Sequence, residues 1–118
     1  MNTRRKGYQR EKELRDTFNK HGWVTDFKPM SRYQSSDLLG RFDFVAVKEG
    51  VIKWIQVKST KSHYYKARKD IEKWMLKKGL DIHAEVWFRE DRGKWKGCYV
   101  GSQGFVTLDH IDKELSLR

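Results

Sequence analysis

The segment that most constrains this chain runs from Phe42 to Lys58. Two runs rich in Val, Ile and aromatic residues lie on either side of Glu49-Gly50, a pair of residues suited to a two-residue turn. The pattern therefore predicts a β-hairpin. If this turn sets the register, paired residues are equally far from it along the chain, so that Asp43 lies directly opposite Gln56.

The same register predicts which side chains share a face. It pairs Val45 with Trp54 and Val47 with Ile52, and cross-strand partners lie about 5 Å apart on one face of the hairpin. We expect these apolar residues to form the base of that face. The face ends in a polar cluster of Asp43, Gln56 and Lys58. Polar and charged groups at the end of an apolar face require compensation, so the cluster predicts a functional site.

The charge of the chain indicates the kind of partner. With 118 residues, 26 of them basic and 16 acidic, the net charge is +10. We expect one domain spanning residues 1–118. Such an excess of positive charge in a small domain favours a polyanionic partner, most often nucleic acid. The alternative is a soluble basic protein without such a partner.

The single cysteine, Cys98, excludes an intrachain disulfide and fits a reducing cytoplasm. No Cys or His lies near it at metal-ligand spacing, so we do not expect a structural zinc site. No apolar run approaches the roughly 20 residues needed to span a bilayer. The basic N-terminus is not followed by an apolar segment, so a signal peptide is not expected either, and we predict no membrane association.

Hydrophobic periodicity and turn residues predict the remaining elements. We expect a basic N-terminal arm over 1–7, a long loop over 28–41, and a last helix capped by Asp109. The expected helices cover 8–21, 65–78 and 109–117. The expected strands outside the hairpin cover 23–27, 84–90, 95–100 and 105–108. This order predicts an α/β fold with a central mixed β-sheet flanked by helices.

Glu11 is the acidic residue of the first helix that could point inward. Leu14 and Phe18 define the buried stripe of that helix, and Glu11 lies on or beside it. The alternative is an i, i+4 ion pair with Arg15 on a solvated face. The 28–41 loop leaves two interpretations open as well, because long loops in small domains are often functional, whereas its composition also fits disorder.

These residues could support phosphodiester hydrolysis. A divalent metal requires hard oxygen ligands, lowers the pKa of a bound water and offsets charge on the phosphate. The oxygens could come from Glu11, Asp43, the Gln56 amide and the backbone carbonyl of Val57. Lys58 could position the nucleophile or stabilise the developing charge.

Asp43, followed by a hairpin and then Gln56-Val57-Lys58, resembles the signature of the PD-(D/E)xK nuclease superfamily. A more specific likeness comes from the first helix. Residues 5–14, Arg-Lys-Gly-Tyr-Gln-Arg-Glu-Lys-Glu-Leu, and residues 20–23, Lys-His-Gly-Trp, resemble the opening of archaeal Holliday-junction resolvases and their viral relatives. The resemblance continues through 42–46 and 58–61 and covers 4 to roughly 100.

The resemblance implies a restriction-endonuclease-like fold. It also implies a homodimer that resolves four-way (Holliday) DNA junctions by paired, symmetric hydrolysis with Mg²⁺, for which Mn²⁺ is expected to substitute. Residue by residue, Glu11 matches the catalytic helix glutamate, Asp43 the metal-binding aspartate and Lys58 the catalytic lysine. Ser31 matches a functional loop serine, with Ser35 and Ser36 as alternatives. An archaeal virus or another mobile element is a source consistent with this family.

Gln56 departs from the glutamate that is usual in this family. A neutral amide can still ligate a metal, but the site loses one negative charge, so we expect weaker metal binding. Gln-x-Lys resembles Mrr-type restriction and NERD-type nuclease domains. Two alternatives therefore stay open, a restriction-type nuclease that cuts duplex DNA and a non-catalytic DNA-binding domain.

Basic and hydroxyl side chains of the arm, the loop and the second helix are our candidates for DNA contact. They are Arg4, Arg5, Lys6, Arg10, Ser31, Arg32, Ser35, Lys61, Lys66, Arg68 and Lys69. We expect no catalytic histidine. An RNA-binding module is a further alternative, but no RNP-like or Gly-x-x-Gly signature supports it.

Overall fold

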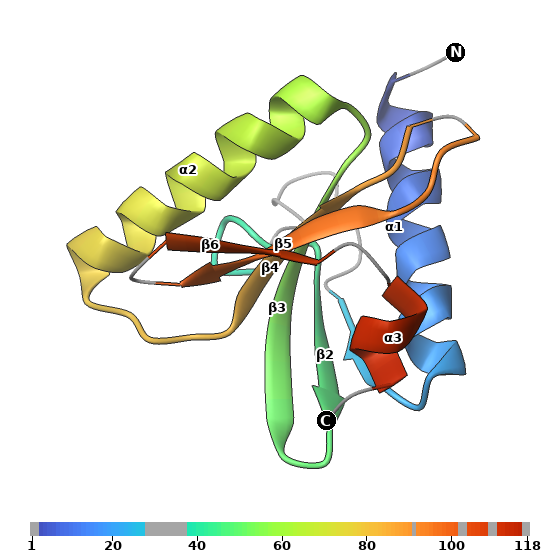
Figure 1. Cartoon of the computed structure of the whole chain (residues 1–118), viewed down its shortest axis with the longest axis horizontal. Coiled ribbons are helices and arrows are strands. Elements are labelled where there is room, and N and C mark those ends of the chain that lie inside the picture. Colours follow the sequence, from blue (N-terminus) through green and yellow to red (C-terminus); the bar gives the residue numbers. More distant parts are fainter. Residues whose placement is uncertain (1–2, 28–37, 91, 102–103, 109–110, 117–118) are drawn as a thin grey trace.

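The computed structural model describes residues 3–27, 38–90, 92–101, 104–108 and 111–116 (Figure 1). The elements in chain order are α1 (Thr3–Lys20), β1 (Val24–Asp26), β2 (Phe44–Lys48), β3 (Val51–Lys58), α2 (Lys61–Lys78), β4 (Ala84–Phe88), β5 (Lys96–Gly101), β6 (Gly104–Leu108) and α3 (Ile111–Ser116). The six strands form one sheet in sequence order, with β3 and β4 parallel and the other neighbours antiparallel. The predicted mixed sheet flanked by helices is confirmed.

The hairpin of β2 and β3 has the predicted register. Val45 pairs with Trp54, and Val47 pairs with Ile52. Both turn residues have positive φ, 50° for Glu49 and 82° for Gly50, as a type I′ hairpin turn requires.

The regular pairing ends at Phe44 and Ile55, so Asp43 is not paired with Gln56 as predicted. The Asp43 N–H instead donates to the carbonyl oxygen of Ile55 at 2.8 Å. This shifted hydrogen bond places Asp43 just beyond the last regular pair of β2.

The predicted apolar base of the hairpin is wrong near the turn. Val47 and Ile52 are 38% and 50% exposed, whereas Phe44, Ala46 and Ile55 on the opposite face are fully buried. The reason is the placement of the helices, because α2 covers its face only toward the end of the hairpin remote from the turn (Figure 1).

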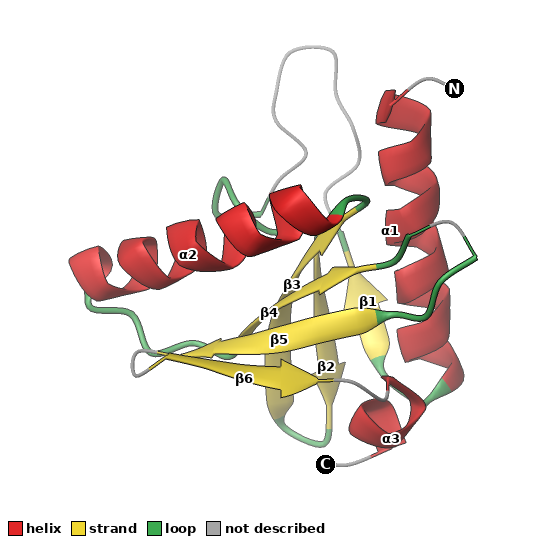
Figure 2. Cartoon of the chain, turned by 45° about the horizontal axis from the view of Figure 1, so that its top comes forward, coloured by secondary structure: helices red, strands yellow, loops and turns green. Residues whose placement is uncertain are grey.

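Helices cover both faces of the sheet (Figure 2). On one face, α2 packs Tyr64, Ala67, Ile71 and Met75 against β4 and β5. On the other face, α1 contributes Leu14 and Phe18, and α3 contributes Leu115. All residues of β4 are buried, as expected of a central strand covered on both faces. Within the ranges given above, no helix has the length and apolarity to cross a membrane.

Two helix starts differ from the prediction. α2 begins at Lys61 rather than at residue 65, because the Thr60 hydroxyl accepts the His63 N–H at 3.3 Å and caps the helix. α1 begins at Thr3, so the predicted arm is helical from that residue onward. Arg and Lys are good helix formers, which explains why this basic stretch continues the helix. Predicted features at 28–37 and at Asp109 lie outside the described residues.

Gly97 of β5 provides a test of the core. A Cβ atom at this position would lie 2.4 Å from the Trp87 indole, whereas a Cβ at Gly7 would meet no atom within 4 Å. We expect Gly97→Ala to lower the free energy of unfolding by about 2 kcal/mol through overpacking. Gly7→Ala, within α1, should raise it by about 1 kcal/mol. Urea unfolding of both variants measures the difference, and equal effects would contradict this packing.

Candidate functional site

A cavity of about 280 Å³ lies between the end of β3, α2 and the chain at 40–41. Gln56 and Lys58, two of the predicted site residues, both line it. The remaining lining residues are Gly40, Arg41, His63, Lys66, Ala67, Asp70 and Ile71. Because β3 and β4 are parallel, the cavity lies at the edge of the sheet where the carboxyl ends of these two strands meet.

The amide of Gln56 is the most informative group in this cavity. Its Oε1 atom is buried and has no hydrogen-bond partner among the described residues. A buried acceptor left unsatisfied costs about 1–3 kcal/mol, and native structures rarely leave one without a water, an ion or a ligand. The orphaned oxygen therefore indicates that a donor or a cation belongs beside it.

Asp43 is fixed next to the same stretch of β3. Its Oδ2 atom accepts the backbone N–H of Val57 at 2.7 Å, while its own N–H donates to Ile55. Val57 lies between Gln56 and Lys58, so the hydrogen bond ties the carboxylate to the strand segment that lines the cavity. Asp43 itself is not among the lining residues.

Lys58 forms no ion pair with any residue in the described ranges, and its side chain lines the cavity. A purely structural pair between Asp43 and Lys58 is therefore not observed. The ammonium group is instead directed to a space that an anionic ligand can enter.

Glu11 is placed differently from the other predicted residues. Its Oε1 lies 3.6 Å from Nη1 of Arg15, the ion pair that the sequence offers as the alternative. The Arg15 guanidinium in turn lies 3.7 Å from the centre of the Phe27 ring. Glu11 does not line the cavity, and no group of three or more His, Cys, Asp or Glu residues that could hold a metal occurs in the part of the chain that is described. The roles of Glu11, Asp43, Gln56 and Val57 as metal ligands stay predictions.

The DNA-binding candidates fall into three groups. Lys61, Lys66 and Lys69 are exposed on α2. Arg10 and Arg68 are held within the fold. The Nε of Arg10 donates to the Arg89 carbonyl at 3.1 Å, and the Arg68 guanidinium lies over the rings of Tyr65 and Phe105 at 4.6 and 4.7 Å. The third group, outside the described side chains, comprises Arg4, Arg5, Lys6, Ser31, Arg32 and Ser35.

Arg41, His63 and Asp70 also line the cavity, and none of them was among the candidate site residues predicted from the sequence. The available signal was helical spacing, because residues 63, 66 and 70 share one face of α2. The predicted start of this helix at residue 65 left His63 outside it.

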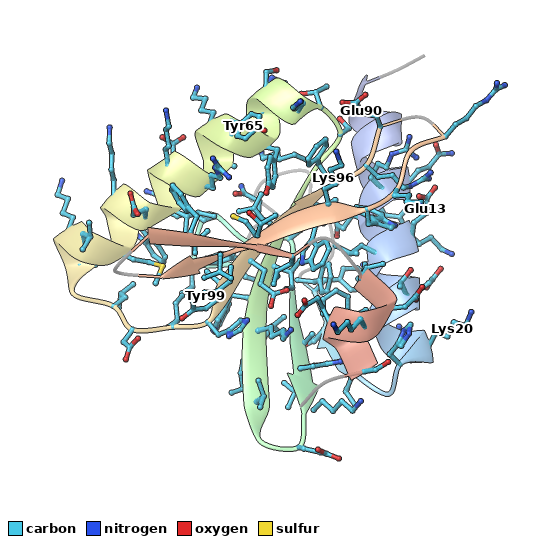
Figure 3. The ribbon with its side chains drawn as sticks, in the orientation of Figure 1. Glu13, Lys20, Tyr65, Glu90, Lys96 and Tyr99 are labelled. Carbon is cyan, nitrogen blue, oxygen red and sulfur yellow. The ribbon has the colours of Figure 1, made fainter. Side chains whose placement is uncertain are left out.

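A second cavity of about 290 Å³ lies where the start of α2 meets the β4–β5 connection. Lys61, Lys94 and Lys96 line it together with Glu90. Figure 3 shows Glu90, in the connection after β4, and Lys96, the first residue of β5, near the start of α2. The lysines extend the positive charge of the first cavity along the same edge of the sheet.

A buried ionic cluster on the opposite face of the sheet was also missed. Glu85 of β4 is 1% exposed and lies 2.8 Å from Nζ of Lys53. It also accepts a hydrogen bond from Nε1 of Trp87 at 2.8 Å and contacts His83 at 2.5 Å. Burial by itself would raise the pKa of the Glu85 carboxyl, but the His83 hydrogen bond and the Lys53 charge lower it below its ordinary value.

The sequence matches no family model and no curated protein sequence. A comparison of folds does find similarity. The structure of Hjc from Archaeoglobus fulgidus, a Holliday junction resolvase from an archaeal hyperthermophile, matches with a TM-score of 0.54 and 18% sequence identity over 95% of each chain. The chain therefore shares the fold of Hjc, which confirms the predicted fold class.

The Glu85 cluster predicts the acid sensitivity of the fold. A carboxyl whose folded-state pKa lies below its ordinary value of 4.5 contributes stability above that pH, and this contribution is lost as the pH falls through the folded-state pKa. Glu85→Gln should cost about 3 kcal/mol at pH 7, because it leaves Lys53 buried without its partner, and less at pH 3. Urea unfolding between pH 3 and pH 7 measures this change.

The matched control is Asp16→Asn, at a carboxylate that is 63% exposed in a surface pair with Lys12. It should change stability by less than about 1 kcal/mol at either pH. A Glu85→Gln deficit that is equal at pH 3 and pH 7 would contradict the assigned charge state.

Proposed function

We propose that the chain is a metal-dependent DNA endonuclease that resolves four-way junctions by paired phosphodiester hydrolysis. The observation that carries this proposal is one cavity lined by the buried Gln56 Oε1 and by Lys58, neither of which is paired with a described residue. The fold shared with Hjc and the net charge of +10 are consistent with it.

The cation of this proposal is Mg²⁺, with Mn²⁺ as a substitute, because hard divalent cations prefer oxygen ligands. Asp43 and Glu11 would supply carboxylates, Gln56 its amide oxygen and Val57 its backbone carbonyl. The orphaned Gln56 Oε1 is the acceptor that such an ion would satisfy. A bound ion of this kind lowers the pKa of a coordinated water and offsets negative charge on the phosphate.

The residues of the chain supply the rest of the chemistry. The Lys58 ammonium can stabilise charge that develops on the phosphate or orient the attacking water. The Val57 N–H bond holds the Asp43 carboxylate in one orientation. Arg41, Lys58 and Lys66 make the cavity cationic, which suits a phosphodiester backbone. The lysines of the second cavity can hold the phosphates that flank the one being cut.

The junction as substrate and the homodimer are the finer parts of this proposal. The matching protein Hjc is a Holliday junction resolvase, and we extend that substrate to this chain. Symmetric cutting of two strands requires two sites, so we propose that two copies of the chain act together.

The neutral amide at Gln56 favours a second candidate, a DNA-binding domain without catalysis. It removes a negative charge that a metal site would use, and the described residues contain no group of acidic, His or Cys side chains suited to a metal. A duplex-cutting nuclease of the Gln-x-Lys type is a further outcome that the following assay separates.

Purified protein is incubated with a four-way junction, the matching duplex or single strands, in Mg²⁺, Mn²⁺ or chelator. We expect paired nicks in the junction only, and only with metal. Lys58→Ala should lower the cleavage rate by about 100-fold or more while junction binding persists. The control is Lys20→Ala, because this lysine is exposed at the far end of α1 (Figure 3). The control variant should cleave the junction at the wild-type rate.

Other outcomes separate the alternatives. Equal cutting of duplex and junction would favour the duplex nuclease, and tight binding without cutting in either metal would favour the non-catalytic domain. A Lys58→Ala protein that cleaves like the wild type would overturn the assignment of this cavity as the active site.

A further inference from the structure

Arg41 lies at the boundary between two neighbouring cavities. Besides the first cavity, it lines a third cavity of about 360 Å³ on the side of α2 that leads toward the end of the helix. The third cavity is lined by Arg41, Asp70, Lys73, Trp74, Lys77 and Lys78. Because the two cavities share Arg41 and Asp70, they form one continuous surface along α2.

The backbone around Arg41 forms a tight turn. The Arg41 N–H donates to the Leu38 carbonyl at 3.0 Å, and Leu38 and Phe42 exchange hydrogen bonds of 2.6 and 2.9 Å. Leu39 and Gly40 have φ of 54° and 71°, the two positive values of a type I′ turn. The fully buried ring of Phe42 anchors this turn in the core, so the backbone of Arg41 is fixed.

Trp74 of α2 positions the side chain of Arg41. The guanidinium carbon lies 5.0 Å from the centre of the Trp74 ring, within the range of a cation–π contact. The Trp74 ring in turn packs against Phe42, with the ring centres 5.9 Å apart. The guanidinium forms no hydrogen bond or ion pair with a described residue, although the Asp70 carboxylate lines the same two cavities. Its N–H donors therefore stay available to a ligand while its position is held.

The charges along this surface favour an anionic ligand. The lining of the two cavities contains one carboxylate, that of Asp70, against six cations, which are Arg41, Lys58, Lys66, Lys73, Lys77 and Lys78. Residues 66, 70, 73 and 77 follow helical spacing, so Lys66, Lys73 and Lys77 form a line on one face of α2. A guanidinium binds a phosphate through two parallel hydrogen bonds, and a line of cations suits the repeating phosphates of a nucleic-acid strand.

We propose that Arg41 binds a phosphate of the DNA backbone at the boundary of the first and third cavities, and that the bound strand continues from there along Lys73 and Lys77 of α2. This contact uses side chains alone and needs no metal ion. The inference rests on the proposed DNA substrate. It adds a phosphate-binding residue outside the candidates predicted from the sequence, and it directs the strand along the second half of α2. Trp74 is a positioning residue, because it acts through Arg41.

The test is the binding of a fluorescein-labelled four-way junction to the full-length chain, measured by fluorescence anisotropy in chelator at several salt concentrations. Arg41→Ala should raise the Kd by about 10-fold and lower the slope of log Kd against log salt by about 1. Arg41→Lys should weaken binding nearly as much, because an ammonium lacks the planar fork that binds a phosphate.

A double-mutant cycle tests the positioning role of Trp74. Trp74→Leu should weaken junction binding in the wild-type background and add nothing in the Arg41→Ala background. The control for lost charge is Lys113→Ala, because this lysine is exposed on α3, which packs on the opposite face of the sheet. The control variant should bind the junction like the wild type.

Each part of the inference can fail separately. An Arg41→Ala chain that binds like Lys113→Ala would overturn the role of Arg41. Full binding by Arg41→Lys, or an equal loss from Trp74→Leu in both backgrounds, would contradict the positioned guanidinium.

The measurement in chelator also separates this inference from the proposed function. A chain that binds the junction through Arg41 but cuts no DNA in either metal would refute the endonuclease and leave the inference standing. A chain that cuts junctions with metal and binds them normally after Arg41→Ala would leave the proposed function standing and refute the inference.

Discussion

The parallel pairing of β3 with β4 is the constraint on which the rest of the structure depends. Neighbouring antiparallel strands can be joined by short turns, but a parallel pair needs a long crossover, and here that crossover contains α2. The helix has to start where β3 ends and cross the sheet before β4 begins (Figure 2). The first turns of α2 therefore lie next to Gln56 and Lys58. The cavity forms between this part of the helix and the end of β3.

The two polar clusters of the molecule illustrate the difference between a structural and a ligand-binding arrangement. Glu85 is buried, but Lys53, His83 and Trp87 surround its carboxylate with partners. Both oxygens of the Glu85 carboxylate therefore already have partners within the protein. On the other face of the sheet, Gln56 has a buried acceptor with no described partner in an open, cationic cavity. Unsatisfied polarity next to an accessible space is the physical sign of a site.

Local patterns in the sequence predicted what depends on local physics. The hairpin register follows from a turn whose residues tolerate positive φ, and the end of α2 follows from Gly79, which adopts the left-handed conformation. The burial of Val47 and Ile52 was predicted wrongly, because how far α2 extends over this face of the hairpin depends on its packing against β4 and β5. The role of Thr60 as the helix cap was not predicted, because the Ser, Thr and Lys residues around it are equally typical of a loop.

The candidate site was predictable only in part for the same reason. Gln56 and Lys58 belong to one strand, so their shared face follows from alternation. Arg41 and Asp70 come from two other segments, and their presence in the cavity depends on how α2 crosses the sheet. No periodicity within one element carries that information.

The Glu49-Gly50 turn lies at the exposed tip of the hairpin, yet it determines on which side of the sheet Gln56 and Lys58 lie. Strand residues alternate between faces, so a register shift of one position would turn Gln56 and Lys58 away from α2 and toward the side that α1 covers. Surface loops usually tolerate insertions and deletions. In this hairpin the residues of the tip can be exchanged for others that accept positive φ, but a one-residue insertion or deletion that shifted the register would remove Gln56 and Lys58 from the cavity beside α2.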